Sequence, residues 1–395
     1  MALKFIDTAD FKGKKVLARF DFNVPLDKND SSVITDTSRI DLALPTIKFI
    51  LESGASKLTL MSHLGRPKGE RDEKFSLEPV ATYLAEQLGK EVILADAPVD
   101  AGVKELLTLN ETKIVLLENL RFDKGETDND EEFASKLAQY GDVYVNDAFG
   151  AAHRKHASVH LINKFFANQN YAGFLIKKEL KALDQILNSP AKPFVAIIGG
   201  AKVSDKIKTI EKLIVSVNKL IIGGAMAYPF LKAKGHEVGD SLCSDDDVKL
   251  AQSILKADKG NKILLPVDHV IAESFQAEPE FCNDTNIKVG FMGLDIGEAT
   301  LNLYTNALKE AKTILWNGPM GLFENPKYEN GTMSLAHFIA DTEAFSLVGG
   351  GDSVSAVKKS GHSDKFSHIS TGGGASLEYI EKGELPGIQA LRFGV

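Results

Sequence analysis

Short apolar runs rich in β-branched residues alternate with amphipathic stretches along the whole chain of 395 residues. This alternation is typical of βαβ units, in which parallel strands are flanked by helices. The apolar runs predict strands at 15–20, 57–62, 113–118, 142–146, 194–198, 219–222, 262–266, 313–316, 345–348 and 366–370. Helical spacing predicts helices over 205–217, 247–257, 331–341 and 375–382, and Ser76 is placed to cap a helix with Val80, Leu84 and Leu88 on one face.

The segment 172–188 is the best candidate for a domain boundary. Its apolar residues fall on one helical face, charged residues cover the others, and Asn188-Ser189-Pro190 ends the pattern. Because the chain is too long for one ordinary core, two large domains are expected, and this helix is interpreted as their connector. The alternative is an ordinary surface helix of a single domain.

Composition narrows the function classes. The 46 basic and 54 acidic residues give a net charge of −8, which disfavours DNA, RNA and anionic membranes as partners. The start of the chain lacks a signal-peptide core, and Gly223, Gly224 and Pro229 interrupt the apolar stretch 220–231. The two cysteines form no metal or redox motif, so a reducing, cytoplasmic location is expected.

Arginine is scarce and unevenly placed, since six of the seven arginines precede residue 155. Polar groups follow each predicted strand of the first half, and they are Asp21 and Asn23, His63 and Arg66, Asn119 and Arg121, and Asp147 and Arg154, while Arg39 lies between the first strand and the next helix. Ligands of parallel sheets bind beyond the carboxyl ends of the strands. Converging guanidinium groups bind phosphate or carboxylate, so a small multiply charged anion is predicted here. Taken singly, each arginine is more often a solvated surface charge, but four at equivalent positions favour a shared site.

His63, His153 and His156 lie among these arginines. A metal site is disfavoured because the arginines would repel a cation, and no G-x-S-x-G motif supports nucleophilic catalysis. The histidines are therefore interpreted as binding donors, and a histidine nucleophile or base is the alternative.

The second half has glycine after nearly every predicted strand. The turns begin at Gly199, Gly223, Gly318, Gly349 and Gly372. Glycine allows a ligand to approach the backbone, and a following helix N-terminus favours phosphate. Five such turns predict a nucleotide or polyphosphate site, although neither G-x-x-x-x-G-K-[ST] nor G-x-G-x-x-G is present.

Three charged residues accompany these turns. Lys202 and Lys206 are four positions apart and could reach two phosphates from one side. Asp352 would oppose bare phosphate, but it is explained if Mg²⁺ lies between them. Its alternative role is the N-cap of a helix over 353–360.

An anion site in one half and a polyphosphate site in the other suggest phosphoryl transfer. The sequence also resembles the phosphoglycerate kinase family over its whole length. The motifs, in family order, are FDFNVPL (20–26), SHLGRPKG (62–69), LLENLRF (116–122), NDAFGAAHRKHAS (146–158), IIGGAKVSDKI (197–207), LWNGPMGLFE (315–324), GGGDSV (349–354), STGGGASLE (370–378) and LPGIQAL (385–391).

The resemblance implies an α/β fold of two Rossmann-like domains, each a doubly wound parallel sheet flanked by helices. The expected parts are an N-terminal phosphoglycerate-binding domain (1–171), an interdomain helix (172–188), a nucleotide-binding domain (189–375) and a returning segment (376–395). The implied reaction is glycolytic or gluconeogenic: 1,3-bisphosphoglycerate and ADP interconvert with 3-phosphoglycerate and ATP. Mg²⁺ bound to the nucleotide, a monomer and hinge closure are also implied.

The resemblance also implies roles for individual residues. Phosphoglycerate would contact Asp21, Asn23, Arg39, His63, Arg66, Arg121 and Arg154. The nucleotide would contact Gly200, Ala201, Lys206, Gly293, Leu294, Asn317, Glu324, Gly350, Gly351, Asp352 and Ser353, with Asp352 reaching the metal. The transferring phosphoryl group would be held by Arg39, Lys202, Gly372 and Gly373. Two other positions depart from the family pattern: Ala151 stands where Thr or Ser is common, and Lys155 stands where a small residue is usual.

Two other functions remain open on the residues alone. A kinase of another small carboxylic acid would keep the glycine turns but need a different anion pocket. A non-catalytic metabolite-binding or nucleotide-binding protein would keep the fold, although Arg39, Lys202 and Asp352 favour catalysis.

Overall fold

The computed structural model describes residues 2–395, and the chain divides into two compact units. Unit 1 comprises Met1–Lys181 and Glu384–Val395, and unit 2 comprises Ala182–Gly383. Each unit has a six-stranded parallel sheet with helices packed against it, so the predicted α/β fold class is confirmed. The division falls inside helix α6 (Phe174–Asn188). The predicted boundaries after residues 171, 188 and 375 remain predictions.

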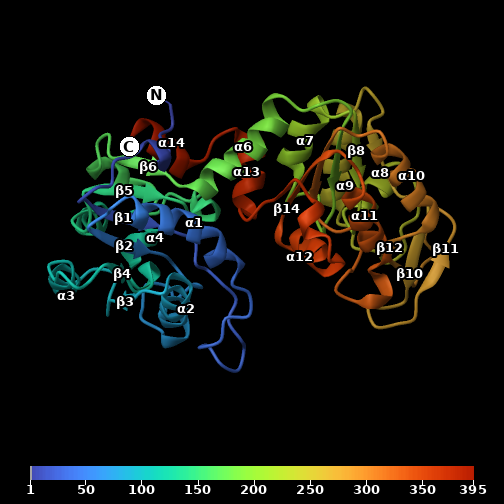
Figure 1. The fold of residues 1–395 in the computed structure, drawn as a ribbon. Helices are drawn as coiled ribbons and strands as arrows, with labels where there is room; N and C mark the ends of the chain where they lie inside the picture. Colours follow the sequence, from blue (N-terminus) through green and yellow to red (C-terminus); the bar gives the residue numbers. More distant parts are fainter. Residues whose placement is uncertain (1) are drawn as a thin grey trace. The chain divides into compact units, whose positions relative to one another are not determined.

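The sheet of unit 1 has the strand order β3-β4-β2-β1-β5-β6 (Figure 1). Its strands are β1 (Lys15–Arg19), β2 (Lys57–Met61), β3 (Ile93–Leu94), β4 (Ile114–Leu116), β5 (Val143–Asn146) and β6 (Asn170–Ala172). The helices are α1 (Ser38–Glu52), α2 (Glu78–Leu88), α3 (Ala101–Leu106), α4 (Lys124–Thr127), α5 (Glu131–Ala138), the start of α6, and α14 (Pro386–Phe393). All pairings are parallel, so the carboxyl ends of the strands share one edge.

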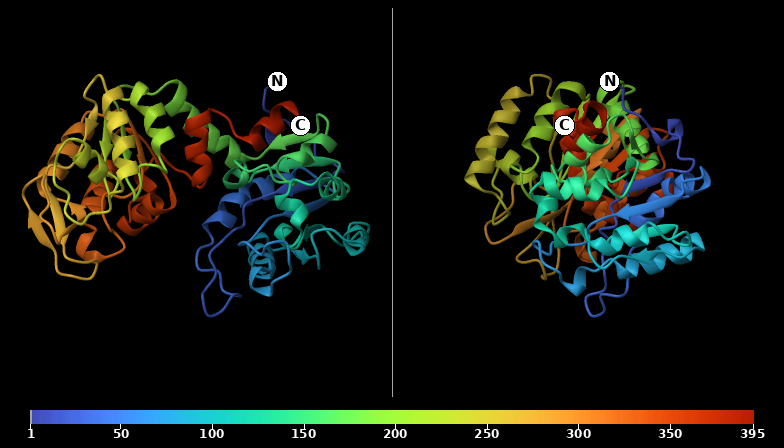
Figure 2. Two further views of the ribbon diagram at one scale, coloured as in Figure 1. Left: turned by 180° about the vertical axis from the view of Figure 1, so that it is seen from behind. Right: turned by 90° about the vertical axis from the view of Figure 1, so that its left-hand side faces the viewer.

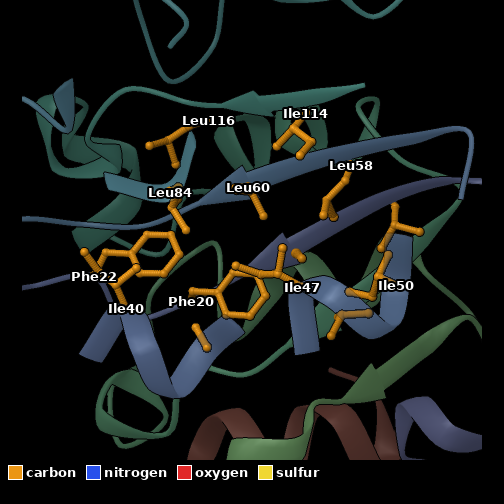
Figure 3. Close-up of a cluster of buried hydrophobic side chains, with 14 of the residues drawn as sticks. Phe20, Phe22, Ile40, Ile47, Ile50, Leu58, Leu60, Leu84, Ile114 and Leu116 are labelled. Carbon is orange, nitrogen blue, oxygen red and sulfur yellow. The ribbon is translucent and has the colours of Figure 1, made fainter. Parts of the chain in front are cut away.

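The core of unit 1 lies between this sheet and helices α1 and α2. Figure 3 shows α1 directing Ile40, Ile47 and Ile50 into a cluster that also contains Phe20 and Leu58. All five side chains are buried, and each contributes roughly 1.5–3 kcal/mol by leaving water. This packing fixes α1, and therefore Arg39 in its first turn, against the sheet.

Helix α14 returns to unit 1 at the end of the chain. The Asn170 side-chain amide donates to the carbonyl of Leu391 at 3.3 Å, and the Gly387 amide donates to Ala152 at 2.8 Å. Figure 2 shows this segment, in red, beside the green strand β6. The preceding helix, α13 (Gly374–Lys382), instead lies in unit 2, where Glu381 accepts a hydrogen bond from Thr209.

The main sheet of unit 2 has the order β15-β14-β13-β7-β8-β9, and a second sheet has the antiparallel order β11-β10-β12. The strands are β7 (Phe194–Ile198), β8 (Lys219–Ile222), β9 (Ile263–Leu264), β10 (His269–Ala272), β11 (Glu280–Cys282), β12 (Met292–Ile296), β13 (Thr313–Asn317), β14 (Phe345–Gly349) and β15 (His368–Ile369). Besides α13, the helices are α7 (Ile207–Ser216), α8 (Ala227–Ala233), α9 (Asp245–Ala257), α10 (Glu298–Leu308), α11 (Asn330–Ala340) and α12 (Gly351–Ser360).

Two helix starts differ from the sequence interpretation. The hydroxyl of Ser76 accepts from the amide of Glu78 at 3.2 Å, but α2 begins at Glu78 and the Ser76 O–H donates to buried Glu118. Asp352 does not cap a helix over 353–360, because α12 already begins at Gly351 and Gly350 occupies the N-cap. The capping role is therefore wrong, and the Asp352 carboxylate is exposed.

No helix within residues 2–395 combines the length and the hydrophobicity that crossing a membrane requires.

Candidate active site

The loops that follow β1 and β2 bring the first predicted residues of unit 1 together. The Asp21 carboxylate meets Arg39 of α1, with 2.5 Å between Oδ2 and Nη1. Burial alone would raise the pKa of Asp21, but Arg39, with His63 and Arg19, outweighs burial and holds the pKa below its usual value. The Asn23 side chain accepts from the Gly65 amide at 2.8 Å and thereby ties the two loops to each other.

His63 and Arg121 lie next to this pair. The His63 ring is 5% exposed, and burial together with Arg19, Arg121 and Arg39 lowers its pKa well below the ordinary value, against the opposing effect of Asp21. Arg121 donates through Nη1 to the carbonyl of Gly65 at 2.7 Å, whereas its Nε is buried without a hydrogen-bond partner. Burial lowers the pKa of Arg121 to about 10, so the side chain stays cationic at neutral pH.

Arg66 and Arg154 complete the cluster at its exposed side. The charge of Arg66 acts on Arg121, and the charge of Arg154 acts on His156, whose pKa falls to about 3, chiefly through burial and then through the surrounding arginines. Such like charges repel one another unless an anion lies among them. The edge of unit 1 therefore has the electrostatics of a binding site for a small, multiply charged anion.

In unit 2, the turns after β7 and β13 pack backbone against backbone. The Gly199 amide donates to the carbonyl of Asn317 at 2.9 Å, and a side chain at Gly318, where φ is +102°, would collide with the backbone of Gly199. The half-buried Lys206 ammonium donates to both oxygens of Asn317. Burial lowers the pKa of Lys206 to about 8, although Asp352 and Asp205 act in the opposite direction.

A cavity of about 200 Å³ opens beside these turns. Six of the predicted nucleotide residues line it, and they are Gly200, Ala201, Gly293, Leu294, Glu324 and Asp352. Its apolar wall includes Tyr228, Phe275 and Met292, which the sequence analysis did not single out. An apolar wall opposite polar turns suits a flat heteroaromatic base with a charged tail.

The N-terminus of α12 follows β14 at the same edge. Gly350 takes a φ of +89°, and Gly351 has open space where a Cβ would stand. The Ser353 hydroxyl accepts from the Gly318 amide, so Ser353 is committed to holding the β13 turn. Free backbone N–H groups at this helix end favour phosphate oxygens.

The residues predicted to hold the transferring group lie in two other turns of unit 2. Lys202 is exposed in the loop after β7. The turn after β15 carries Gly372, whose amide donates to Ser370 Oγ at 3.2 Å, and Gly373, which precedes α13. Both turns follow the carboxyl ends of strands in the main sheet of unit 2.

Asp352 is the metal ligand that the sequence predicts. Within residues 2–395, no group of three or more His, Cys, Asp or Glu side chains is arranged to hold a metal ion. One exposed carboxylate fits Mg²⁺ nonetheless, because this ion often takes one or two protein carboxylates together with substrate phosphates. The residues therefore fit a metal that arrives with the nucleotide.

Comparisons with known proteins agree on one family. A family model described as phosphoglycerate kinase matches residues 6–383. A curated phosphoglycerate kinase of Clostridium botulinum (strain Hall) is 50% identical over 395 residues, covering 98% of each chain. A second, of Anaeromyxobacter sp. (strain Fw109-5), is 53% identical over 398 residues, covering 99% of this chain and 100% of the relative.

Solved structures show the same similarity. The phosphoglycerate kinase of Coxiella burnetii has a TM-score of 0.87 and 37% identity, covering 99% of this chain and 98% of the other. The phosphoglycerate kinase of Pyrococcus horikoshii OT3 has a TM-score of 0.85 and 30% identity, covering 99% of both chains.

Proposed function

Because the chain belongs to the phosphoglycerate kinase family and is a phosphotransferase, we propose that it carries out Mg²⁺-dependent, reversible phosphoryl transfer between ATP and the carboxylate of 3-phosphoglycerate. One observation carries the proposal. The same chain holds an arginine-rich edge in unit 1 and a glycine-lined cavity with Lys206 and Asp352 in unit 2. The first suits a phosphorylated carboxylic acid, and the second suits a nucleotide.

In unit 1, the phosphoglycerate would be held by donors alone. Arg66, Arg121 and Arg154 would bind its phosphate, since their guanidinium groups pair with phosphate oxygens. The unpaired Nε of Arg121 supports this assignment because a buried donor without a partner is costly unless a ligand satisfies it. Asn23 and Asp21 would shape the site by holding the Gly65 loop and Arg39.

In unit 2, the nucleotide base would lie in the cavity against Gly293 and Leu294, with its phosphates toward Gly200 and the start of α12. Lys206 would neutralise phosphate charge, and Glu324 lies at the cavity wall, where a ribose hydroxyl could donate to it. When Mg²⁺ is bound, it supplies charge neutralisation on the phosphates, and Asp352 would hold it.

The chemical step needs no general base. The carboxylate of 3-phosphoglycerate is already deprotonated at neutral pH, so its oxygen attacks the γ-phosphorus directly. A new carboxylate O–P bond forms, the bond to the β–γ bridging oxygen breaks, and ADP leaves with that oxygen. Arg39, Lys202 and the amides of Gly372 and Gly373 would stabilise charge on the transferring group.

The two ligands must meet for this step, although their sites belong to different units. We therefore expect a change in the arrangement of the units when both substrates are bound, with the hinge around 172–188 and the C-terminal segment. X-ray scattering would detect it as a smaller radius of gyration with both ligands than with either alone. Identical curves under all conditions would contradict closure.

A coupled assay tests the function itself. With MgATP, the purified chain should phosphorylate 3-phosphoglycerate, and acetate and aspartate at equal concentration should give background rates. A preference for another carboxylic acid would favour the alternative kinase. Tight ATP binding without any turnover would favour a non-catalytic binding protein.

A further inference from the structure

Arg19 is a fully buried arginine at the end of β1, below the proposed phosphoglycerate site, and the sequence analysis gave it no role. Burying a guanidinium group costs free energy unless its N–H groups have hydrogen-bond partners. Nη1 donates to the carbonyl of Phe20, and Nε donates to Ser158 Oγ at 2.9 Å. Nη2 faces His63, with 3.0 Å between Nη2 and the ring Nδ1.

Glu126 of α4 provides the balancing charge. Its side chain is also fully buried, and its Oε1 lies 3.9 Å from Arg19 Nη2. The carboxylate accepts from the Ser158 amide at 2.9 Å and from the Ser158 hydroxyl at 2.7 Å. The Ser158 hydroxyl therefore donates to Glu126 and accepts from Arg19, which fixes the direction of every hydrogen bond in this network.

The direction of the hydrogen bond between Arg19 and His63 is fixed as well. An arginine can only donate, so Nδ1 of His63 must accept, and a neutral imidazole that accepts at Nδ1 carries its proton at Nε2. Burial and the neighbouring arginines keep the ring neutral by lowering its pKa. The contact with Arg19 occupies Nδ1, so Nε2 is the ring nitrogen that can serve a ligand, and Arg39 and Arg121 act on the same ring.

We infer that Arg19 is a positioning residue, which holds His63 in the tautomer protonated at Nε2 and thereby makes His63 a hydrogen-bond donor to the anion. The inference rests on the proposed function for the identity of that anion. Arg19 itself would not touch the ligand, because Phe20, Ser158, His63 and Glu126 surround its guanidinium group. With the other tautomer, Nε2 would present a lone pair to the anion and repel it.

Nitrogen NMR of the free, ¹⁵N-histidine-labelled chain tests the tautomer without any activity measurement. His63→Gln identifies the His63 signals by their loss. We expect an unprotonated Nδ1 and a protonated Nε2 throughout the range of about pH 6–8. A proton on Nδ1, or an equal mixture of tautomers, would overturn the inference whatever the activity of the chain.

Kinetics then test the consequence for binding. Glutamine places its amide near the position of Nε2, whereas asparagine places it near Nδ1. We expect His63→Asn to raise KM for 3-phosphoglycerate roughly ten- to a hundredfold, the size of one hydrogen bond to a charged group. His63→Gln should recover most of this loss, and KM for ATP should stay unchanged in both variants. Equal impairment by Asn and Gln would contradict a donor at Nε2.

The double variant Arg19→Met/Glu126→Gln tests Arg19 directly. Both buried charges are removed together because the single change would leave Glu126 buried and unpaired. We expect the NMR signals to show a mixture of His63 tautomers and KM for 3-phosphoglycerate to rise about tenfold in the folded variant. Retention of a pure Nε2–H tautomer would overturn the role of Arg19. If the tautomer is as inferred in the wild type but 3-phosphoglycerate is not phosphorylated, the proposed function fails instead.

Discussion

The two units present the same kind of edge, the carboxyl ends of a six-stranded parallel sheet, and equip it in different ways. Unit 1 places side chains there, chiefly the guanidinium groups around Arg39 and Arg121. Unit 2 places backbone N–H groups there, in the turns at Gly200 and Gly318 and at the start of α12, with Lys206 as a half-buried cation. One architecture therefore offers two kinds of edge to the proposed anionic ligands.

The difference follows from what each ligand would require. Fixed charges suit a small anion that several arginines can surround, but these like charges also repel one another: after burial, which is the main cause, Arg19 and Arg66 lower the pKa of Arg121 further. Backbone N–H groups carry only partial charge, so they can line a longer polyphosphate without comparable repulsion. Substitutions that remove a charge should therefore act mainly through unit 1, and added Cβ atoms should act mainly through unit 2.

Arg39→Ala should give the largest effect, on the side-chain edge. Arg39 is proposed to stabilise charge on the transferring group, and loss of such a donor lowers kcat by about a thousandfold. Binding of MgATP, measured by calorimetry, should stay within about twofold because no backbone group of unit 2 changes.

Arg71→Ala is the matched control. Arg71 is an arginine of the same unit that pairs with Glu73 at the surface, so its loss should leave kcat unchanged. A retained kcat in Arg39→Ala would contradict the proposed role, and an equal loss in Arg71→Ala would attribute it to net charge alone.

The second prediction concerns what the units have in common. Each has a buried aspartate whose pKa is raised to about 7 by burial, against the backbone amides that donate to it. In unit 1, Asp147 accepts from Thr46 at 2.6 Å and from the amide of Ile176 in α6 at 2.9 Å. In unit 2, Asp295 accepts from the Gly331 amide in α11 at 2.7 Å.

A raised pKa in the folded state means that folding favours the protonated form. The stabilisation is fully present below about pH 4 and is lost as the pH rises through about 7, by a few kcal/mol per carboxyl group. Asp147→Asn and Asp295→Asn should each flatten this dependence, measured by urea unfolding at about pH 5 and about pH 8. If each variant differs from the wild type by the same free energy at both pH values, the raised pKa values are wrong.

Local pattern was sufficient for the central strands but not for contacts between distant residues. The apolar runs predicted β7 and β8 with the observed bounds, because a buried parallel strand is a continuous apolar segment. The short edge strands β3 and β6 were not predicted, since two or three residues carry little pattern. The antiparallel strands β10, β11 and β12 were also not predicted. Arg121 could be singled out because this scarce residue type follows a predicted strand. Arg39 was predicted to lie ahead of the next helix, which is wrong, because it lies in the first turn of α1.

Arg19 and Asp147 could not be assigned in the same way. Arg19 meets Ser158, which is 139 residues away, and Asp147 meets Thr46, which is 101 residues away. Arg19 ends β1 and Asp147 directly follows β5, so both lie at predicted strand ends like the proposed ligand-facing groups, and nothing in the neighbouring sequence indicates that these two turn inward. The arginines at the edge of unit 1 could therefore be singled out from the sequence, whereas the buried contacts of Arg19 and Asp147 could not.

The smallest expected effect concerns the edge of unit 2, where backbone N–H groups are proposed to bind phosphate. Gly351 begins α12, has no positive φ, and has open space where a Cβ would stand, so Gly351→Ala should fold with unchanged or slightly higher stability. If phosphate oxygens approach this backbone, the added methyl group should weaken ATP binding about tenfold, or about 1.4 kcal/mol, and leave 3-phosphoglycerate binding unchanged.

Gly260→Ala is the control, because a Cβ there meets only the flexible Lys262 side chain, outside the nucleotide cavity. Calorimetry that shows equal ATP affinity in both variants would mean that the phosphates do not approach α12, and that unit 2 binds its ligand through Lys202 and Lys206, as unit 1 does through its arginines.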